Sequence, residues 1–134
     1  FPEELLRLVD IFTPNEIETA SLVGFNIDSW DKASEAAHIF LQKGVKQSII
    51  KLGNRGAFLA NQKFEQIYPS VPVEAIDTIG AGDAFNGALA VALNEGKTIN
   101  EAVQWGNAAG AFAATKKGTQ TAMPSRSELM VMLG

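Results

Sequence analysis

The chain has 134 residues, of which 46% are hydrophobic and 19% are charged, and its formal net charge is −4 at pH 7. This length suits one globular domain with a sizeable hydrophobic core. The acidic balance and the lack of a long basic run argue against nucleic acid or an anionic membrane surface as a partner. No cysteine is present, which excludes disulfides, thiolate metal sites and a cysteine nucleophile. We expect a cytoplasmic protein that acts on a small molecule.

The beginning of the sequence, Phe1-Pro2-Glu3, resembles neither an initiator methionine nor a signal peptide. The most apolar run, residues 87–93, is far too short to cross a bilayer. We therefore expect a piece of a longer protein and no membrane partner.

The first predicted elements alternate strands with helices. Residues 9–12 fit a short buried strand. The motif Thr13-Pro14-Asn15-Glu16 has the pattern of a capping box with proline at the first helical position, which predicts a helix over residues 14–24. Asn15 and Glu18 then share one face of its first turn, beyond the carboxyl end of a strand, where α/β sheets bind ligands. The alternative is that both are polar first-turn residues favoured by the helix dipole.

The middle of the chain predicts a helix and then several strands. An apolar stripe at helical spacing indicates a helix over residues 29–43, and it consists of Trp30, Ala33, Ala37, Phe40 and Leu41. His38 lies inside this helix and is assigned no role. Strands over residues 45–52 and 57–60, joined by a turn at residues 53–56, predict a β-hairpin. An edge strand is expected over residues 64–68, followed by an extended segment to residue 76.

The last third predicts three helices. The first ends at Gly96 and is indicated by apolar residues at helical spacing, which are Phe85, Ala88, Leu89, Ala92 and Leu93. Capping boxes at residues 98–101 and 125–128 open the other two, of which the first extends to about residue 115. That helix carries a narrow face of mostly small residues, which predicts close packing: Ala102, Val103, Gly106, Ala109 and Ala113. Residues 116–119 are expected to form a loop. The predicted fold class is α/β, with a mainly parallel sheet flanked by helices and a β-hairpin near one edge.

The segment Asp77-Thr78-Ile79-Gly80-Ala81-Gly82-Asp83 places two glycines and an acid at a predicted helix start. Glycine lets the backbone approach a ligand, and the free N–H groups of a helix start attract anions. A carboxylate there suits a group that takes a proton from an attacking hydroxyl. Phe85 breaks a dinucleotide fingerprint, and Ala88-Leu89 replaces the residues that a Walker loop requires. The alternative to a phosphate-handling site is that these glycines form an ordinary strand-to-helix turn.

This segment resembles the D-T-x-G-A-G-D signature of the ribokinase-like (phosphofructokinase-B type) sugar kinases. The N-x-x-E element of that family is matched by Asn15 to Glu18, and residues 51–56 and 107–118 are also similar. The resemblance covers the whole chain but only the C-terminal half of the family. It implies a ribokinase-like fold and ATP-dependent phosphoryl transfer to a hydroxyl of a small sugar.

The resemblance also implies a role for individual residues. Asp83 would deprotonate the sugar hydroxyl, and the backbone N–H groups of Gly80, Ala81 and Gly82 would form an anion hole. Glu18 would act near Mg²⁺ through water. The nucleotide would be bound by Asn15, Lys51, Gly53, Gly56 and Asn107. The alternatives are a plain hairpin turn at the glycines and an Asn107 side chain that satisfies a backbone group. A potassium-type site, formed largely by backbone carbonyls, would involve Asp77, Ile79, Ala113, Lys116, Gly118 and Ala122.

In this interpretation residues 1–134 are the nucleotide-binding and catalytic part of a ribokinase-like domain, without the N-terminal part that carries the sugar pocket and the lid. The expected cofactors are ATP and Mg²⁺, with K⁺ as a further expectation, and a homodimer is a further expectation for the full-length protein. The alternative function is a non-catalytic nucleotide-binding or regulatory homologue, or a fragment kept as a folding unit.

Overall fold

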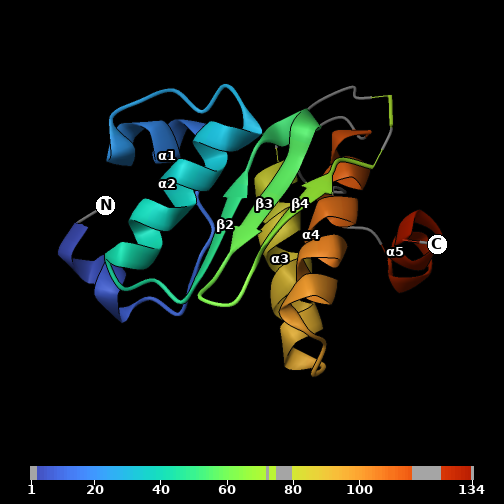
Figure 1. Cartoon of the computed structure of the whole chain (residues 1–134). Coiled ribbons are helices and arrows are strands. Elements are labelled where there is room, and N and C mark those ends of the chain that lie inside the picture. The colour runs from blue at the N-terminus through green and yellow to red at the C-terminus, as the bar shows by residue number, and fades with distance from the viewer. Residues whose placement is uncertain (1–2, 72, 75–79, 116–124, 134) are drawn as a thin grey trace. The chain divides into compact units, whose positions relative to one another are not determined.

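A computed structural model describes residues 3–71, 73–74, 80–115 and 125–133 (Figure 1). A 3₁₀ helix over Glu3–Leu8 precedes strand β1 (Ile11–Phe12) and helices α1 (Glu16–Val23) and α2 (Trp30–Gln42). Strand β2 (Gln47–Lys51), a 3₁₀ turn (Gly53–Arg55), and strands β3 (Gly56–Ala60) and β4 (Glu65–Pro69) follow. The remaining helices are α3 (Ala81–Asn94), α4 (Ile99–Ala114) and α5 (Arg126–Leu133). The chain divides into two compact units, residues 1–52 with 57–68, and residues 53–56 with 69–134.

The sheet has the order β1-β2-β3-β4. β1 runs parallel to β2 because the connection between them contains two helices, as a parallel crossover requires. β2 and β3 are antiparallel, with Ile49 opposite Leu59, because a single short turn joins them. This hairpin and the edge position of β4 were predicted. The described sheet is mixed, since the expected parallel pairing occurs at β1 and β2 while the hairpin adds an antiparallel pair.

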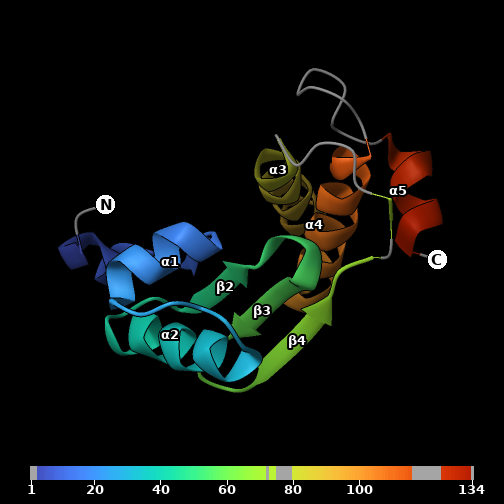
Figure 2. The ribbon, with the colours of Figure 1, turned by 90° about the horizontal axis from the view of Figure 1, so that it is seen from above.

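The core of the first unit lies between α2 and the hairpin (Figure 2). Ser29 caps α2 by accepting a hydrogen bond from the N–H of Lys32 at 3.1 Å. The predicted apolar stripe of α2 faces Ile50 and Phe58, and the ring of Phe40 meets that of Phe12 edge-on at 5.1 Å between centroids. The period of the apolar residues therefore predicted the buried face of this helix correctly.

The beginning of the chain differs from the prediction. The expected strand over residues 9–12 is reduced to Ile11–Phe12, and helix α1 begins at Glu16 instead of Pro14. The predicted capping box at Thr13 is therefore wrong. The reason is that Pro14 still belongs to the extended chain, because its carbonyl accepts a hydrogen bond from the N–H of Lys51 at 2.9 Å.

In the second unit, α3 and α4 lie side by side (Figure 2). The predicted capping boxes of α4 and α5 are both present, formed by Thr98 with Glu101 and by Ser125 with Glu128. Arg126 of α5 forms an ion pair with Glu95, and its guanidinium lies 5.4 Å from the ring centroid of Trp105. These contacts attach α5 to the C-terminal end of α3 and to the middle of α4.

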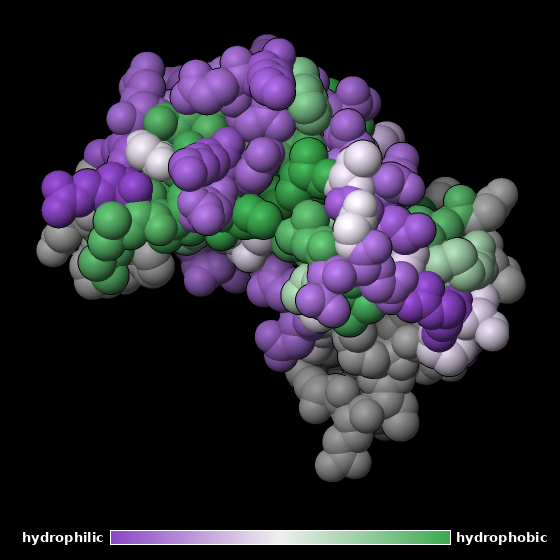
Figure 3. Space-filling view, turned by 90° about the horizontal axis from the view of Figure 1, so that it is seen from below, coloured by the Kyte–Doolittle hydropathy of each residue, from purple (hydrophilic) through white to green (hydrophobic). Residues whose placement is uncertain are grey.

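The surface carries both polar and apolar side chains, as one face shows (Figure 3). Among the described residues the most exposed large apolar side chains are those of Ile17 (81%) and Leu8 (72%). None of the helices in the described ranges has the length and hydrophobicity needed to span a membrane.

Candidate functional site

Helix α3 begins directly after a glycine. Gly80 is its N-cap residue and has φ 86° and ψ −7°, a left-handed conformation that glycine adopts without strain. The carbonyl of Gly80 accepts the N–H of Ala84 at 2.9 Å, while the first N–H groups of any α-helix have no partner within it. Among the described residues no side chain caps this helix start. The start of α3 thus has the backbone conformation that the predicted anion hole requires, and binding of an anion there stays a prediction.

Asp83 lies in the first turn of α3 and its side chain is exposed. The partial positive charge of a helix start favours a negative side chain at this position. Gly82 is exposed as well. The first turn of α3 therefore contains backbone N–H groups and the Asp83 carboxylate together.

Asn15 and Glu18 lie together at the start of α1, in a reciprocal capping box. The N–H of Glu18 donates to Asn15 Oδ1 at 2.8 Å, and the N–H of Asn15 donates to Glu18 Oε1 at 2.9 Å. Both side chains are exposed. The structure thus confirms that the two residues are neighbours. It also shows that they form the capping box of α1, which the sequence analysis had placed at Thr13 and Glu16.

Lys51 lies beside Asn15, because these two residues form an isolated parallel bridge. The sequence analysis placed both in the nucleotide site, and the structure brings them together in the first unit. Gly53 and Gly56 have φ values of 59° and 109°, so the turn after β2 requires glycine at both positions. A side chain on Gly53 would meet nothing within 4 Å, which shows open space at this turn.

Asn107 projects from α4 and donates a hydrogen bond from Nδ2 to the carbonyl of Pro69 at 2.6 Å. This is the backbone contact that was weighed as the alternative to a place beside adenine. Ala113, the described member of the predicted potassium-type site, is buried in α4. Asp77, Ile79, Lys116, Gly118 and Ala122 lie outside the described residues. In the described ranges no three acidic or histidine side chains gather where they could hold a metal ion.

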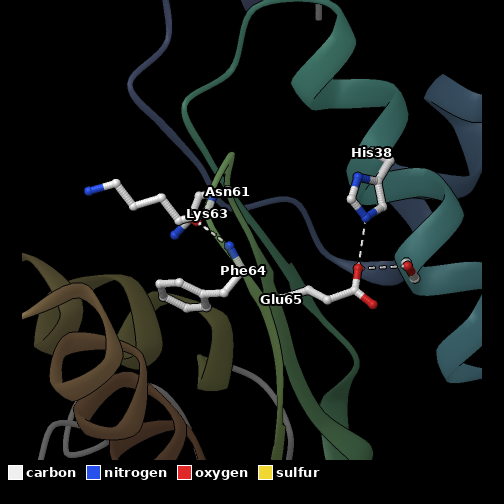
Figure 4. Close-up of polar contacts among 6 residues, drawn as sticks. His38, Asn61, Lys63, Phe64 and Glu65 are labelled. Carbon is white, nitrogen blue, oxygen red and sulfur yellow. Dashed lines mark hydrogen bonds and ion pairs between the residues drawn. The ribbon is translucent and has the colours of Figure 1, made fainter.

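A polar cluster that the sequence analysis did not predict joins α2 to β4 (Figure 4). His38 Nε2 lies 2.7 Å from Glu65 Oε2, and Ser34 Oγ donates to the same oxygen at 3.0 Å. The hydrogen bonds from His38 and Ser34 lower the pKa of Glu65, against a smaller opposing effect of burial. Ser34 and His38 are four residues apart on one helix face, a spacing that could have suggested a shared partner.

Fold and site together define an α/β protein in which a helix begins after a left-handed glycine and carries an exposed acid in its first turn. Residues 2–126 match the pfkB family of carbohydrate kinases. The chain belongs to this family, which confirms the resemblance and the ribokinase-like fold class.

The relatives include several ribokinases. The ribokinase of Haemophilus influenzae is 42% identical over 131 residues, which are 98% of this chain and 43% of that protein. The crystal structure of Thermotoga maritima ribokinase superposes with a TM-score of 0.90 at 42% identity, covering 99% of this chain and 45% of that one. The structure of Arabidopsis thaliana ribokinase complexed with ribose and ATP superposes with a TM-score of 0.90 at 36% identity. The match covers 98% of this chain and 43% of that one. The chain therefore spans less than half the length of these relatives.

Proposed function

We propose that this chain is the nucleotide-binding and catalytic part of an ATP-dependent sugar kinase. The observation that carries the proposal is the start of α3, where left-handed Gly80, an uncapped first turn and exposed Asp83 occur in a member of a carbohydrate kinase family. Because relatives are named ribokinases and one was solved with ribose and ATP, ribose is the first acceptor to test. Sugar-contacting groups and a lid would come from residues outside the matched part of the family.

In the proposed reaction the sugar hydroxyl oxygen forms a bond to the γ-phosphorus while the bond from that phosphorus to the ADP oxygen breaks. Asp83 accepts the hydroxyl proton, and the backbone N–H groups of Gly80, Ala81 and Gly82 stabilise charge on the transferred group. Phosphoryl transfer depends chiefly on positioning and charge stabilisation, so fixed backbone donors and one base suit this chemistry.

Mg²⁺ would neutralise charge on the phosphates when bound. Mg²⁺ prefers oxygen ligands and retains several waters, and the exposed Glu18 carboxylate fits a contact through water. One oxygen of Glu18 already accepts the N–H of Asn15, which fixes the orientation of the carboxylate. Asn15 and Lys51, adjacent at the carboxyl ends of β1 and β2, are proposed to contact the nucleotide.

The decisive experiment replaces Asp83 with asparagine in the full-length polypeptide that contains this sequence. The kcat should fall roughly 10²- to 10⁴-fold, while the affinity for ATP stays within a few fold. Asp31→Asn is a matched control, because Asp31 is also an exposed acid in the first turn of a helix, α2. Turnover near that of the parent in Asp83→Asn would refute the assignment.

A second candidate is a homologue that binds nucleotide without transferring phosphate. It shares the proposed nucleotide contacts at Asn15 and Lys51 with the first candidate and differs from it in giving Asp83 no role in catalysis. Calorimetry with ATP and a measurement of ADP release with a panel of sugars separate the two candidates. Release of ADP with any sugar would exclude the binding-only candidate.

A further inference from the structure

Helices α3 and α4 lie side by side (Figure 2), and two glycines of α4 leave no room for a Cβ atom against α3. A Cβ atom on Gly110 would lie 3.3 Å from the carbonyl oxygen of Ala81. A Cβ atom on Gly106 would lie 3.0 Å from two ring carbons of Phe85 and 3.0 Å from its carbonyl oxygen. Both distances are shorter than ordinary van der Waals contact, so neither position accepts a methyl group without a shift.

The contact at Gly110 involves the peptide group that also carries the N–H of Gly82. A peptide bond is planar, so the carbonyl of Ala81 and the N–H of Gly82 move together. No side chain among the described residues caps this turn. A methyl group on Gly110 would therefore press on the peptide group that orients the Gly82 donor, and glycine leaves this peptide group its room.

We infer that Gly110 is a positioning residue for the proposed anion hole, acting through the Ala81–Gly82 peptide group. The inference rests on the proposed function, in which the Gly82 N–H contacts the transferred phosphoryl group. A Cβ atom on Gly106 would instead meet Phe85, one turn further along α3. Glycine is among the least favourable residues for a helix interior, and α4 contains it where α3 comes close.

The test compares Gly110→Ala with Gly106→Ala in the full-length polypeptide. The added methyl of Gly110→Ala should displace the Ala81–Gly82 peptide by a few tenths of an ångström. We expect kcat to fall roughly three- to tenfold, because misplacement on the scale of 1 Å costs on the order of a hundredfold. The KM values for ATP and sugar should stay within about twofold, since the displaced donor acts mainly in the transition state.

A spectroscopic measurement tests the same contact without turnover. In protein labelled with ¹⁵N-glycine, the amide resonance of Gly82 should shift in Gly110→Ala and remain close to its parent position in Gly106→Ala. Gly106→Ala, with the tighter contact, should lower the thermal unfolding midpoint more but kcat less than Gly110→Ala does. If Gly106→Ala does not fold, the Gly82 resonance and the kcat of Gly110→Ala are compared with those of the parent alone.

A parent-like kcat in Gly110→Ala would overturn the inference, whatever the amide resonance does. Equal losses of kcat in the two alanine variants would also overturn it, because a general widening between the helices would then explain both. Failure of the proposed function has a different signature, which is normal turnover in Asp83→Asn.

Discussion

Asn15 and Glu18 cap each other at the start of α1, with each side chain accepting the backbone N–H of the other at 2.8 and 2.9 Å. The same two residues are proposed to contact the nucleotide and the Mg²⁺ shell. A substitution at either position can therefore change both the stability of the helix and the binding of the ligand. The first two experiments are designed to separate these effects.

Asn15→Ala should lower the free energy of unfolding by about 1 kcal/mol, because alanine cannot cap a helix. Asn15→Ser should retain most of that stability, since serine is a good N-cap residue. If the Asn15 amide contacts the nucleotide, both variants should weaken ATP binding by a similar factor. Denaturant unfolding and calorimetry measure the two quantities. ATP binding by Asn15→Ser equal to that of the parent would show that Asn15 is only a cap.

Glu18→Gln should change stability by less than about 0.5 kcal/mol, because glutamine also completes a capping box. The loss of charge should raise the Mg²⁺ concentration needed for half-maximal rate. Glu101→Gln is a matched control, since Glu101 has the same place in the capping box of α4. Identical Mg²⁺ titrations for Glu18→Gln, Glu101→Gln and the parent would show that Glu18 is structural.

Asn107→Ala should lower the free energy of unfolding by about 1 kcal/mol, because it leaves the carbonyl of Pro69 without its 2.6 Å donor. Asn107→Asp should cost more, since a carboxylate cannot donate and would face a carbonyl oxygen. Gln104→Ala, on an exposed position of the same helix, is the control. A lower affinity for ATP in Asn107→Ala and Asn107→Asp, but not in Gln104→Ala, would support a place for Asn107 beside adenine. The same affinity for ATP in all three variants would contradict it.

The pH dependence of stability should include a contribution from Glu65. Its folded-state pKa is lowered by the hydrogen bonds from His38 and Ser34. The unfolded chain therefore takes up this proton first as the pH falls below the ordinary value of 4.5, and the folded state loses stability on the acid side. The contribution should be less than about 1 kcal/mol, because both side chains are about half exposed.

The measurement compares the free energy of unfolding at about pH 6 and about pH 3.5 for the parent, Ser34→Ala and Glu65→Gln. The acid-induced loss should be largest in the parent, smaller in Ser34→Ala and smallest in Glu65→Gln. The same loss in all three proteins would show that the cluster contributes nothing to folding.

Local patterns predicted most of the secondary structure. The capping boxes at Thr98 and Ser125 were predicted correctly, because each depends on residues within one turn. The box at Thr13 was wrong because a residue distant in sequence, Lys51, binds the carbonyl of Pro14 and keeps it extended. The hairpin was predicted from its turn, whereas the shortness of β1 depends on pairing that no local pattern contains.

Local patterns also predicted one part of the candidate site, whereas another part depends on tertiary contacts. The helix start after Gly80 and the exposure of Asp83 follow from glycine and helix-start chemistry, which the sequence contains directly. The contact of Asn107 with Pro69 and the close approach of Gly110 to Ala81 depend on tertiary packing. The sequence predicted a narrow face on α4, but it could not indicate which peptide group that face would touch.

The position of β4 at the sheet edge has a consequence for solution behaviour. Edge strands expose unpaired backbone groups that can recruit a second chain, and Phe64 and Ile67 add partly exposed apolar surface there. Glu65 opposes such pairing through its charge, and Pro69 lacks the N–H that a pairing strand would need. The hydrogen bonds from His38 and Ser34 lower the pKa of Glu65, so they favour the charged form of this edge residue, which disfavours intermolecular β pairing.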